Sequence, residues 1–292
     1  MPPKRQSKKN AAPTGAASLM PLENFLMENG KDIDLDAFFK ATQANLSNEE
    51  KAQDLFFEAM EAGSEEQELA LITQALELDP DNTDARLWKL EHTYGWFDRV
   101  GELRGIIDTA ARRLEAENGF KEYAGHFWGF IETRPYMRAR QQLVHELLRV
   151  AQKEEAAKEC EEMLELNPND NQGMRYTLLT CYLSLNRQAE AKALFKKYRE
   201  DGCVVFMWGD VLLRWLSPRK TGLEKALAAA REQNAHIEDY LTGMKKLPKR
   251  LPPYYSMGSK EEAVCFAKDL ITAWASHPGA REWLRSQSAE NT

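Results

Sequence analysis

The sequence predicts an all-α protein, and two observations carry this prediction. From Asp36 onward, apolar residues recur three and four positions apart, as at Leu69 and Ile72, and no long stretch alternates with the two-residue period of a strand. In addition, two predicted helix pairs end on nearly the same string, "ALELDPDN" at 75–82 and "MLELNPND" at 163–170. The chain is therefore expected to contain an internal repeat built of helix pairs.

These two strings also indicate the class of repeat. A helix pair that closes on Asp-Pro or Asn-Pro, with small residues where its helices cross, is typical of tetratricopeptide repeats, whose period is about 34 residues. With Pro80 and Pro168 as equivalent ends, the predicted pairs cover 49–82, 83–116, 137–170 and 171–202. The sequence thus predicts a tetratricopeptide-like helical-repeat solenoid, an α-α superhelix, over residues 35–244.

The repeat pattern contains an insertion near 117–136. Pro80 and Pro168 lie 88 residues apart, which is two periods of about 34 plus roughly 20 extra residues. The string "GHFWGFIETRPYMRAR" at 125–140 begins inside this excess and continues into the next helix. Pro135 suits a first helical turn, with Thr133 as its N-cap. We expect residues 125–131 to pack and residues 132–140 to face a ligand.

The two ends of the chain are predicted to differ from the repeats. Residues 1–34 combine a basic start with scattered prolines, glycines and serines, and are expected to form a disordered tail. A proline-rich connector at 245–258 should break the helical run. Ser259 and Glu262 form a capping-box pattern that opens a helix through Trp274, and a short last helix follows. These C-terminal helices of 245–292 are expected to pack on the solenoid.

Composition and charge limit the function classes. The net charge is −7, and four of the first nine residues are basic, so the remainder carries about −11, which argues against a nucleic-acid-binding body. The most apolar stretch, 203–216, is shorter than the roughly 20 residues of a membrane-spanning helix. We expect a cytoplasmic protein with no membrane span. No metal or cofactor is predicted, because the cysteines have no metal-ligand spacing and are expected to be reduced core residues: Cys160, Cys181, Cys203 and Cys265.

A candidate binding surface follows from the repeat class. The first helix of each pair lines the concave face of such an array, and helical spacing places Arg138, Gln141 and His145 on one face of one helix. The same spacing offers Gln172, Arg175 and Tyr182 on the next such helix. Guanidinium groups pair bidentately with carboxylates. The sequence therefore predicts a groove that binds a protein or peptide partner, with an acidic or carboxylate-bearing segment as the favoured ligand.

Three alternatives stay open. The arginines of 134–140 could pair with nearby glutamates while the aromatic residues of 127–136 fill the core. An enzyme or small-ligand protein could use His126, Glu132 and Arg134, although no nucleophile elbow, phosphate loop or metal triad accompanies them, and we expect no enzymatic activity. A structural assembly subunit could use the apolar ends of the array.

Longer strings resemble a known family. "GHFWGFIETRPYMRAR" at 125–140, "LNPNDNQGMRY" at 166–176 and the segment from Asn234 to Ala267 resemble, in order, motifs of the suppressor of tumorigenicity 7 family in its tetratricopeptide form without membrane spans. The resemblance implies an α-helical repeat with a binding or scaffold role and no established reaction. It places emphasis on these motif positions: His126, Trp128, Glu132, Arg134, Tyr136, Arg138, Asn171, Gly173, Arg175 and Tyr176.

Overall fold

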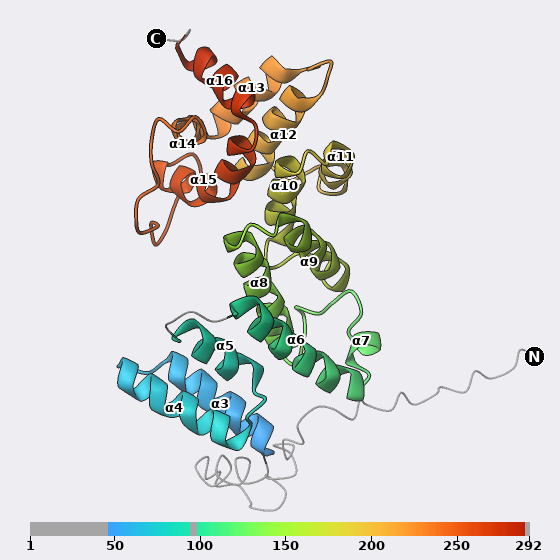
Figure 1. Cartoon of the computed structure of the whole chain (residues 1–292), viewed down its shortest axis with the longest axis vertical. Helices are drawn as coiled ribbons and strands as arrows, with labels where there is room; N and C mark the ends of the chain where they lie inside the picture. The colour runs from blue at the N-terminus through green and yellow to red at the C-terminus, as the bar shows by residue number, and fades with distance from the viewer. Residues whose placement is uncertain (1–45, 94–97, 290–292) are drawn as a thin grey trace, which may run out of the picture. The chain divides into compact units, whose positions relative to one another are not determined.

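A computed structural model describes residues 46–93 and 98–289. Within these ranges every regular element is a helix and no strand occurs, so the all-α prediction is confirmed (Figure 1). The described residues divide into two compact units, one formed by the part before residue 99 together with 105–122, the other by 99–104 together with the part from Tyr123 onward. The predicted tail at 1–34 lies outside the described residues.

The first unit is organised by a helix pair. Helices α3 (Asn48–Met60) and α4 (Glu65–Leu78) pack together, and α5 (Thr83–Glu91) packs against both. Ser47 opens α3 with a complete capping box to Glu50. The helices approach closely because the residues between them are small, and the buried set consists of Ala52, Ala59, Ile72, Ala75, Ala85 and Trp88.

The two similar strings of the sequence form similar turns. Asp79 ends α4 and donates its N–H to the Ala75 carbonyl, and Asn167 ends α9 (Lys153–Leu166) with the same bond to Met163. Three residues later, Asn82 and Asp170 each accept an N–H from the start of the following helix through a side-chain oxygen. The sequence repeat is therefore a repeat of local structure as well.

The second unit contains further consecutive helix pairs. Its helices are α8 (Arg134–Arg149) with α9, α10 (Met174–Ser184) with α11 (Gln188–Lys197), and α12 (Val204–Leu216) with α13 (Leu223–Asn234). Helix α6 (Arg99–Ala116) contributes residues to both units. Helix α10 packs against α9 and α12 as well as α11, so the pairs of this unit stack in chain order (Figure 1).

The C-terminal helices return onto this stack. After a short helix η1 (Ala235–Ile237) and α14 (Glu238–Leu241), residues 245–258 form no helix, as the prolines predict. Helix α15 (Lys260–Ala275) then packs against α10 and α12, and α16 (Pro278–Ala289) follows it (Figure 1). The indoles of Trp208 on α12 and Trp274 on α15 are fully buried and meet edge to face.

Two predicted caps need correction. The Ser259 hydroxyl accepts the Glu262 N–H at 3.0 Å, but the Glu262 carboxylate accepts from Asn234 Nδ2 and the Gly258 N–H, both at 2.8 Å, so only half of the capping box forms. Thr133 precedes α8, yet its side chain makes no cap bond and its hydroxyl donates to carbonyls of the preceding turn instead. In both cases a neighbouring segment supplies a better-placed partner.

The insertion packs through a small part of its sequence. It consists of α7 (Gly119–Glu122) and a series of turns up to Thr133. Phe127 is fully buried, and its N–H donates to the Leu166 carbonyl at 3.2 Å. Phe130 and Ile131, however, are 41% and 64% exposed. The expectation that 125–131 would pack therefore holds for Phe127 and not for these two residues.

All four cysteines are free; Cys160 and Cys181 are buried, while Cys203 and Cys265 are half-buried. Across the described parts of the chain, none of the helices has both the length and the apolar character that crossing a membrane requires.

Candidate functional site

Three helices of the second unit, α8, α10 and α15, border a groove made of two adjoining hollows. The outer hollow has a cavity volume of about 820 Å³ and the inner hollow about 310 Å³. They share His145, Thr177, Lys268 and Asp269. On each helix the earlier lining residues belong to the outer hollow and the later ones to the inner hollow, so the three helices run in the same direction along the groove.

Several residues predicted from the sequence line the outer hollow: Gln141, His145, Asn171, Gly173 and Tyr176. Gln172 connects α8 to the start of α10, because its Nε2 donates to Gln141 Oε1 at 2.9 Å and to the Met137 carbonyl at 3.1 Å. Its own Oε1 is buried and has no hydrogen-bond partner among the described residues. Gln141 and His145 of the predicted α8 face therefore lie along a cavity, whereas Arg138 does not line it.

Arg175 and Tyr182, in contrast, are engaged by protein groups. The Arg175 guanidinium pairs with Asp170 at 2.7 Å and with Asp201 at 2.6 Å, and it lies 4.2 Å from the centre of the Tyr176 ring. Burial tends to lower its pKa, but these carboxylates outweigh burial and the pKa is raised. The Tyr182 hydroxyl donates to Glu161 on α9 at 2.8 Å. Neither side chain lines the two hollows.

The remaining predicted residues lie in the insertion or in the first half of α8, and none of them lines either hollow. Arg134 donates through Nε to the Trp128 carbonyl at 3.0 Å, with its guanidinium 5.8 Å from the indole centre. Tyr136 is buried and Arg138 is half-buried. His126 and Glu132 are both exposed, and within the part of the chain that the structure describes no hydrogen bond or ion pair joins them.

One arginine of this segment pairs with nearby glutamates, as the first of the three alternatives predicts. Arg140 is 5% exposed, contacts Glu159, and donates to Glu162 at 2.5 Å and to the Tyr136 hydroxyl at 3.3 Å. These bonds tie α8 to α9 within one pair. This part of the "RPYMRAR" string is therefore structural.

The electrostatics of the groove are set by three neighbouring side chains. Desolvation lowers the pKa of His145, and the Lys268 ammonium lowers it further, which favours the neutral imidazole. Burial raises the pKa of the Asp269 carboxyl, and Lys268 offsets only part of that effect. Lys268 and Asp269 are adjacent on α15, so they do not face each other. The groove consequently holds charges of both signs without an ion pair between them.

The inner hollow contains functional candidates that the sequence analysis missed. Its lining includes Lys153, Thr180, Ser184 and Asp269. The hydroxyl oxygens of Thr180 and Ser184 are buried and have no hydrogen-bond partner among described residues. A signal was present in the sequence, since Thr177, Thr180 and Ser184 recur with helical spacing on one face of α10. This pattern alone does not indicate a binding site, because the other side of the hollow is formed by residues of α15.

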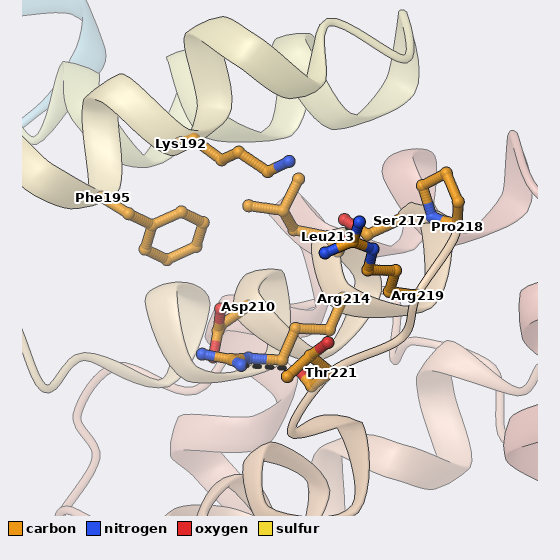
Figure 2. A pocket seen from close by; sticks show the side chains of 9 residues that line it. All are labelled: Lys192, Phe195, Asp210, Leu213, Arg214, Ser217, Pro218, Arg219 and Thr221. Carbon is orange, nitrogen blue, oxygen red and sulfur yellow. Dashed lines mark hydrogen bonds and ion pairs between the residues drawn. The ribbon is translucent and has the colours of Figure 1, made fainter.

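A separate hollow of about 520 Å³ lies between α11, α12 and the turn that follows α12 (Figure 2). Figure 2 shows Lys192 and Phe195 extending from α11 toward Leu213 of α12, with Arg219 on the turn. Arg214 is held by Asp210 at 2.7 Å and by the Thr221 carbonyl at 2.8 Å. This basic hollow contains none of the residues predicted as a site.

No group of three His, Cys, Asp or Glu side chains in the described ranges is arranged to hold a metal ion. Comparison of the chain with models of protein families, with curated proteins and with solved structures finds no match.

Proposed function

We propose that this chain is a tetratricopeptide-like scaffold or adaptor that binds a peptide segment of a partner protein in the groove between α8, α10 and α15. The observation that carries the proposal is the pair of adjoining hollows along α8 and α10. These are the first helices of consecutive pairs, which line the concave face in such arrays. The repeat period and the matching turns after α4 and α9 support the same class.

The chemistry of the outer hollow suits an extended peptide. Tyr255, Met257 and Phe266 supply an apolar wall, and the first two are 49% and 87% exposed. The unpartnered Gln172 Oε1 can accept a backbone N–H of a peptide. Affinity would come from burial of apolar side chains together with a few hydrogen bonds. An apolar residue in the bound segment is therefore part of the proposal.

The charge preference differs from the one that Arg138 and Arg175 predict. The guanidinium group of Arg175 is already paired with two carboxylates of the protein, so it is not available for a bidentate pair with a ligand carboxylate. Lys268 and Asp269 are the charged groups shared by both hollows, and neither has an ion-pair partner among the described residues. A peptide can thus place an acidic side chain near Lys268 or a basic one near Asp269.

A peptide selection tests the proposal. A displayed library of random internal peptides is selected on the wild type, and the enriched peptides are measured by fluorescence anisotropy. We expect His145→Trp, which fills the junction of the hollows, to weaken binding by about tenfold or more, equivalent to about 1.4 kcal/mol. His126→Trp is the matched control, because His126 is also exposed but lies outside the groove. Failure to enrich any peptide, or equal binding by His145→Trp, would contradict the proposal.

The motifs at 125–140 and 166–176 support a second, evolutionary proposal, namely kinship with the suppressor of tumorigenicity 7 family. They supply no reaction, and His126 and Glu132 form no hydrogen-bonded pair in the described structure. A binding role is therefore the function that we propose.

A further inference from the structure

The inner hollow gathers charged side chains of both signs that lack ion pairs. Lys153, Lys268 and Asp269 all line it, and no salt bridge joins any of them to another described residue. Within the described residues Lys153 makes one hydrogen bond, from Nζ to the Ser276 hydroxyl at 3.2 Å. Elsewhere in this unit the buried Arg140 and the half-buried Arg231 are each paired with glutamates. Lys268 is exposed, whereas Lys153 and Asp269 are half-buried, so these two charges in particular gain from a partner from outside the chain.

Two hydroxyl groups in the same hollow also lack partners. Thr180 is 6% exposed, and neither its Oγ1 nor the Ser184 Oγ makes a hydrogen bond with the described residues. A buried polar group without a partner is unfavourable, and a ligand that hydrogen-bonds to it recovers that loss. Leu148 and the buried thiol of Cys181, whose pKa burial raises to about 12, add an apolar floor.

We propose that the inner hollow is a binding site for a small zwitterion, in the simplest case an α-amino acid. The ammonium group of the ligand would pair with Asp269, and its carboxylate with Lys153 or Lys268. The hydroxyls of Thr180 and Ser184 can donate to the carboxylate or accept from the ammonium group. The cavity of about 310 Å³ is at the small end of ligand pockets. This site goes beyond the proposed peptide binding and does not depend on it.

A ligand with both charges fits better than the simpler occupants. A lone anion would leave the Asp269 carboxylate without a counter-charge, and a lone cation would face two lysines. Water can bond to both hydroxyls but carries no charge for Asp269 or Lys153. The side chains do not neutralise one another, since in the described structure no salt bridge joins Asp269 to Lys268 or to Lys153.

The experiment is a calorimetric titration of the ligand-free full chain with each of the standard amino acids. For every amino acid that binds, the matched amine without the carboxylate and the matched acid without the ammonium group are titrated too. We expect at least one amino acid to bind, with both analogues weaker by about tenfold or more. Asp269→Asn and the double variant Lys153→Gln with Lys268→Gln should each weaken binding by a similar factor, and the exposed Asp108→Asn is the control that should leave it unchanged.

Three results would overturn this site: no amino acid binds, an amine or acid analogue binds as well as its parent, or binding survives Asp269→Asn. Circular dichroism confirms that each variant is folded before it is titrated. The peptide selection uses internal peptides without free termini. Failure of one experiment can therefore be told apart from failure of the other.

Discussion

Arg175 joins three segments of the second unit through one side chain. Its guanidinium pairs with Asp170 before α10 and with Asp201 before α12, and it lies against the rings of Tyr176 and Tyr198. Asp170 is only 5% exposed. A buried carboxylate that loses its cation is left without compensation for its desolvation. Arg175 is therefore expected to act on stability.

We expect Arg175→Ala to lower the free energy of unfolding by roughly 2 to 4 kcal/mol, since breaking a buried ion pair commonly costs about 3 to 5 kcal/mol and this one is partly solvated. Urea denaturation followed by circular dichroism measures the change. Arg199→Ala is the control, because the Arg199 side chain is 80% exposed and, among the described residues, pairs only with its neighbour Glu200. Equal effects of the two substitutions would show that the Asp170–Arg175–Asp201 cluster is not stabilising.

This cluster also shows what residue spacing leaves open. Helical spacing correctly placed Arg175 on α10. Its partner Asp201 is 26 residues away, on the segment leading into α12, and only the stacking of the pairs brings it near. The chemical preference of arginine for a carboxylate was foreseeable from the sequence. The sequence alone did not show whether the carboxylate that pairs with Arg175 belongs to the protein or to a ligand.

At the scale of elements, the approach of α10 and α12 depends on Gly209. A Cβ atom at this position would lie 2.8 Å from Leu179 Cδ2, and Leu179 is itself fully buried. The side chain of Leu179 thus has little room to move away. Glycine in a helix interior costs about 1 kcal/mol relative to alanine, so its presence here is explained by packing.

We expect Gly209→Val to lower the free energy of unfolding by roughly 2 to 4 kcal/mol, because overpacking alone costs about 1 to 3 kcal/mol and valine adds further bulk. Gly105 on α6 provides a matched test, since a Cβ there meets nothing within 4 Å. Gly105→Ala should therefore stabilise the protein by about 0.5 to 1 kcal/mol through helix propensity. Thermal unfolding monitored by circular dichroism measures both, and stabilisation by Gly209→Val would refute the packing argument.

The motif at 166–176 can be understood as an element that builds a turn. Asn167 and Asp170 are buried, Asp170 caps the start of α10, and Gly173 adopts a φ of 72°, in the left-handed region that favours glycine. This turn geometry was predictable in outline, because its counterpart at 78–85 has a similar sequence. The left-handed conformation of Gly173 could not be predicted from that counterpart, because the string at 75–82 leads directly from Asn82 into α5 and has no equivalent glycine.

For the molecule as a whole, the periodicity of apolar residues was sufficient to predict helices within the described ranges, and the predicted pairs at 49–82, 137–170 and 171–202 correspond to helices that pack together. The groove was not predictable in the same way. Its first two walls, α8 and α10, follow from the repeat, but the third is α15, which packs against α10 from about 80 residues further along the chain. Lys268 and Asp269 gain their importance only from that long-range contact.

Acid stability should depend in part on Asp79, which lies at the turn after α4. Burial tends to raise the pKa of this carboxyl, but two hydrogen bonds from Arg113 outweigh it and the pKa is lowered. A carboxyl whose pKa is lowered in the folded state stabilises the protein at pH values above its ordinary pKa. This stabilisation is lost as the pH falls through the pKa of the folded state. Arg113→Gln should cost roughly 1 to 2 kcal/mol at neutral pH, a figure reduced because Arg113 is partly exposed.

The check is urea denaturation at a series of pH values from neutral downward, in which the difference between Arg113→Gln and the wild type should shrink as Asp79 becomes protonated. Arg112→Gln, one residue earlier on α6, is the control, since it makes only a bond to the Thr109 hydroxyl among the described partners. A difference that does not depend on pH would argue against the Asp79–Arg113 interaction.

Asp269 should have the opposite effect on the pH dependence. Burial raises the pKa of its carboxyl and Lys268 opposes this only in part, so the folded state binds the proton more tightly than the unfolded chain does. The stabilisation that comes from this protonated carboxyl is fully present at pH values below the ordinary pKa of Asp. It is lost as the pH rises through the raised pKa of the folded state. In ligand-free protein, Asp269→Asn should therefore raise the melting temperature at neutral pH and have little effect near pH 3, where even an Asp with the ordinary pKa of about 3.9 is largely protonated. Asp108→Asn, on an exposed site, should show no such pH-dependent gain. A lower melting temperature for Asp269→Asn at neutral pH would mean that the carboxylate is stabilised within the chain, and the inner hollow would then need no cationic partner.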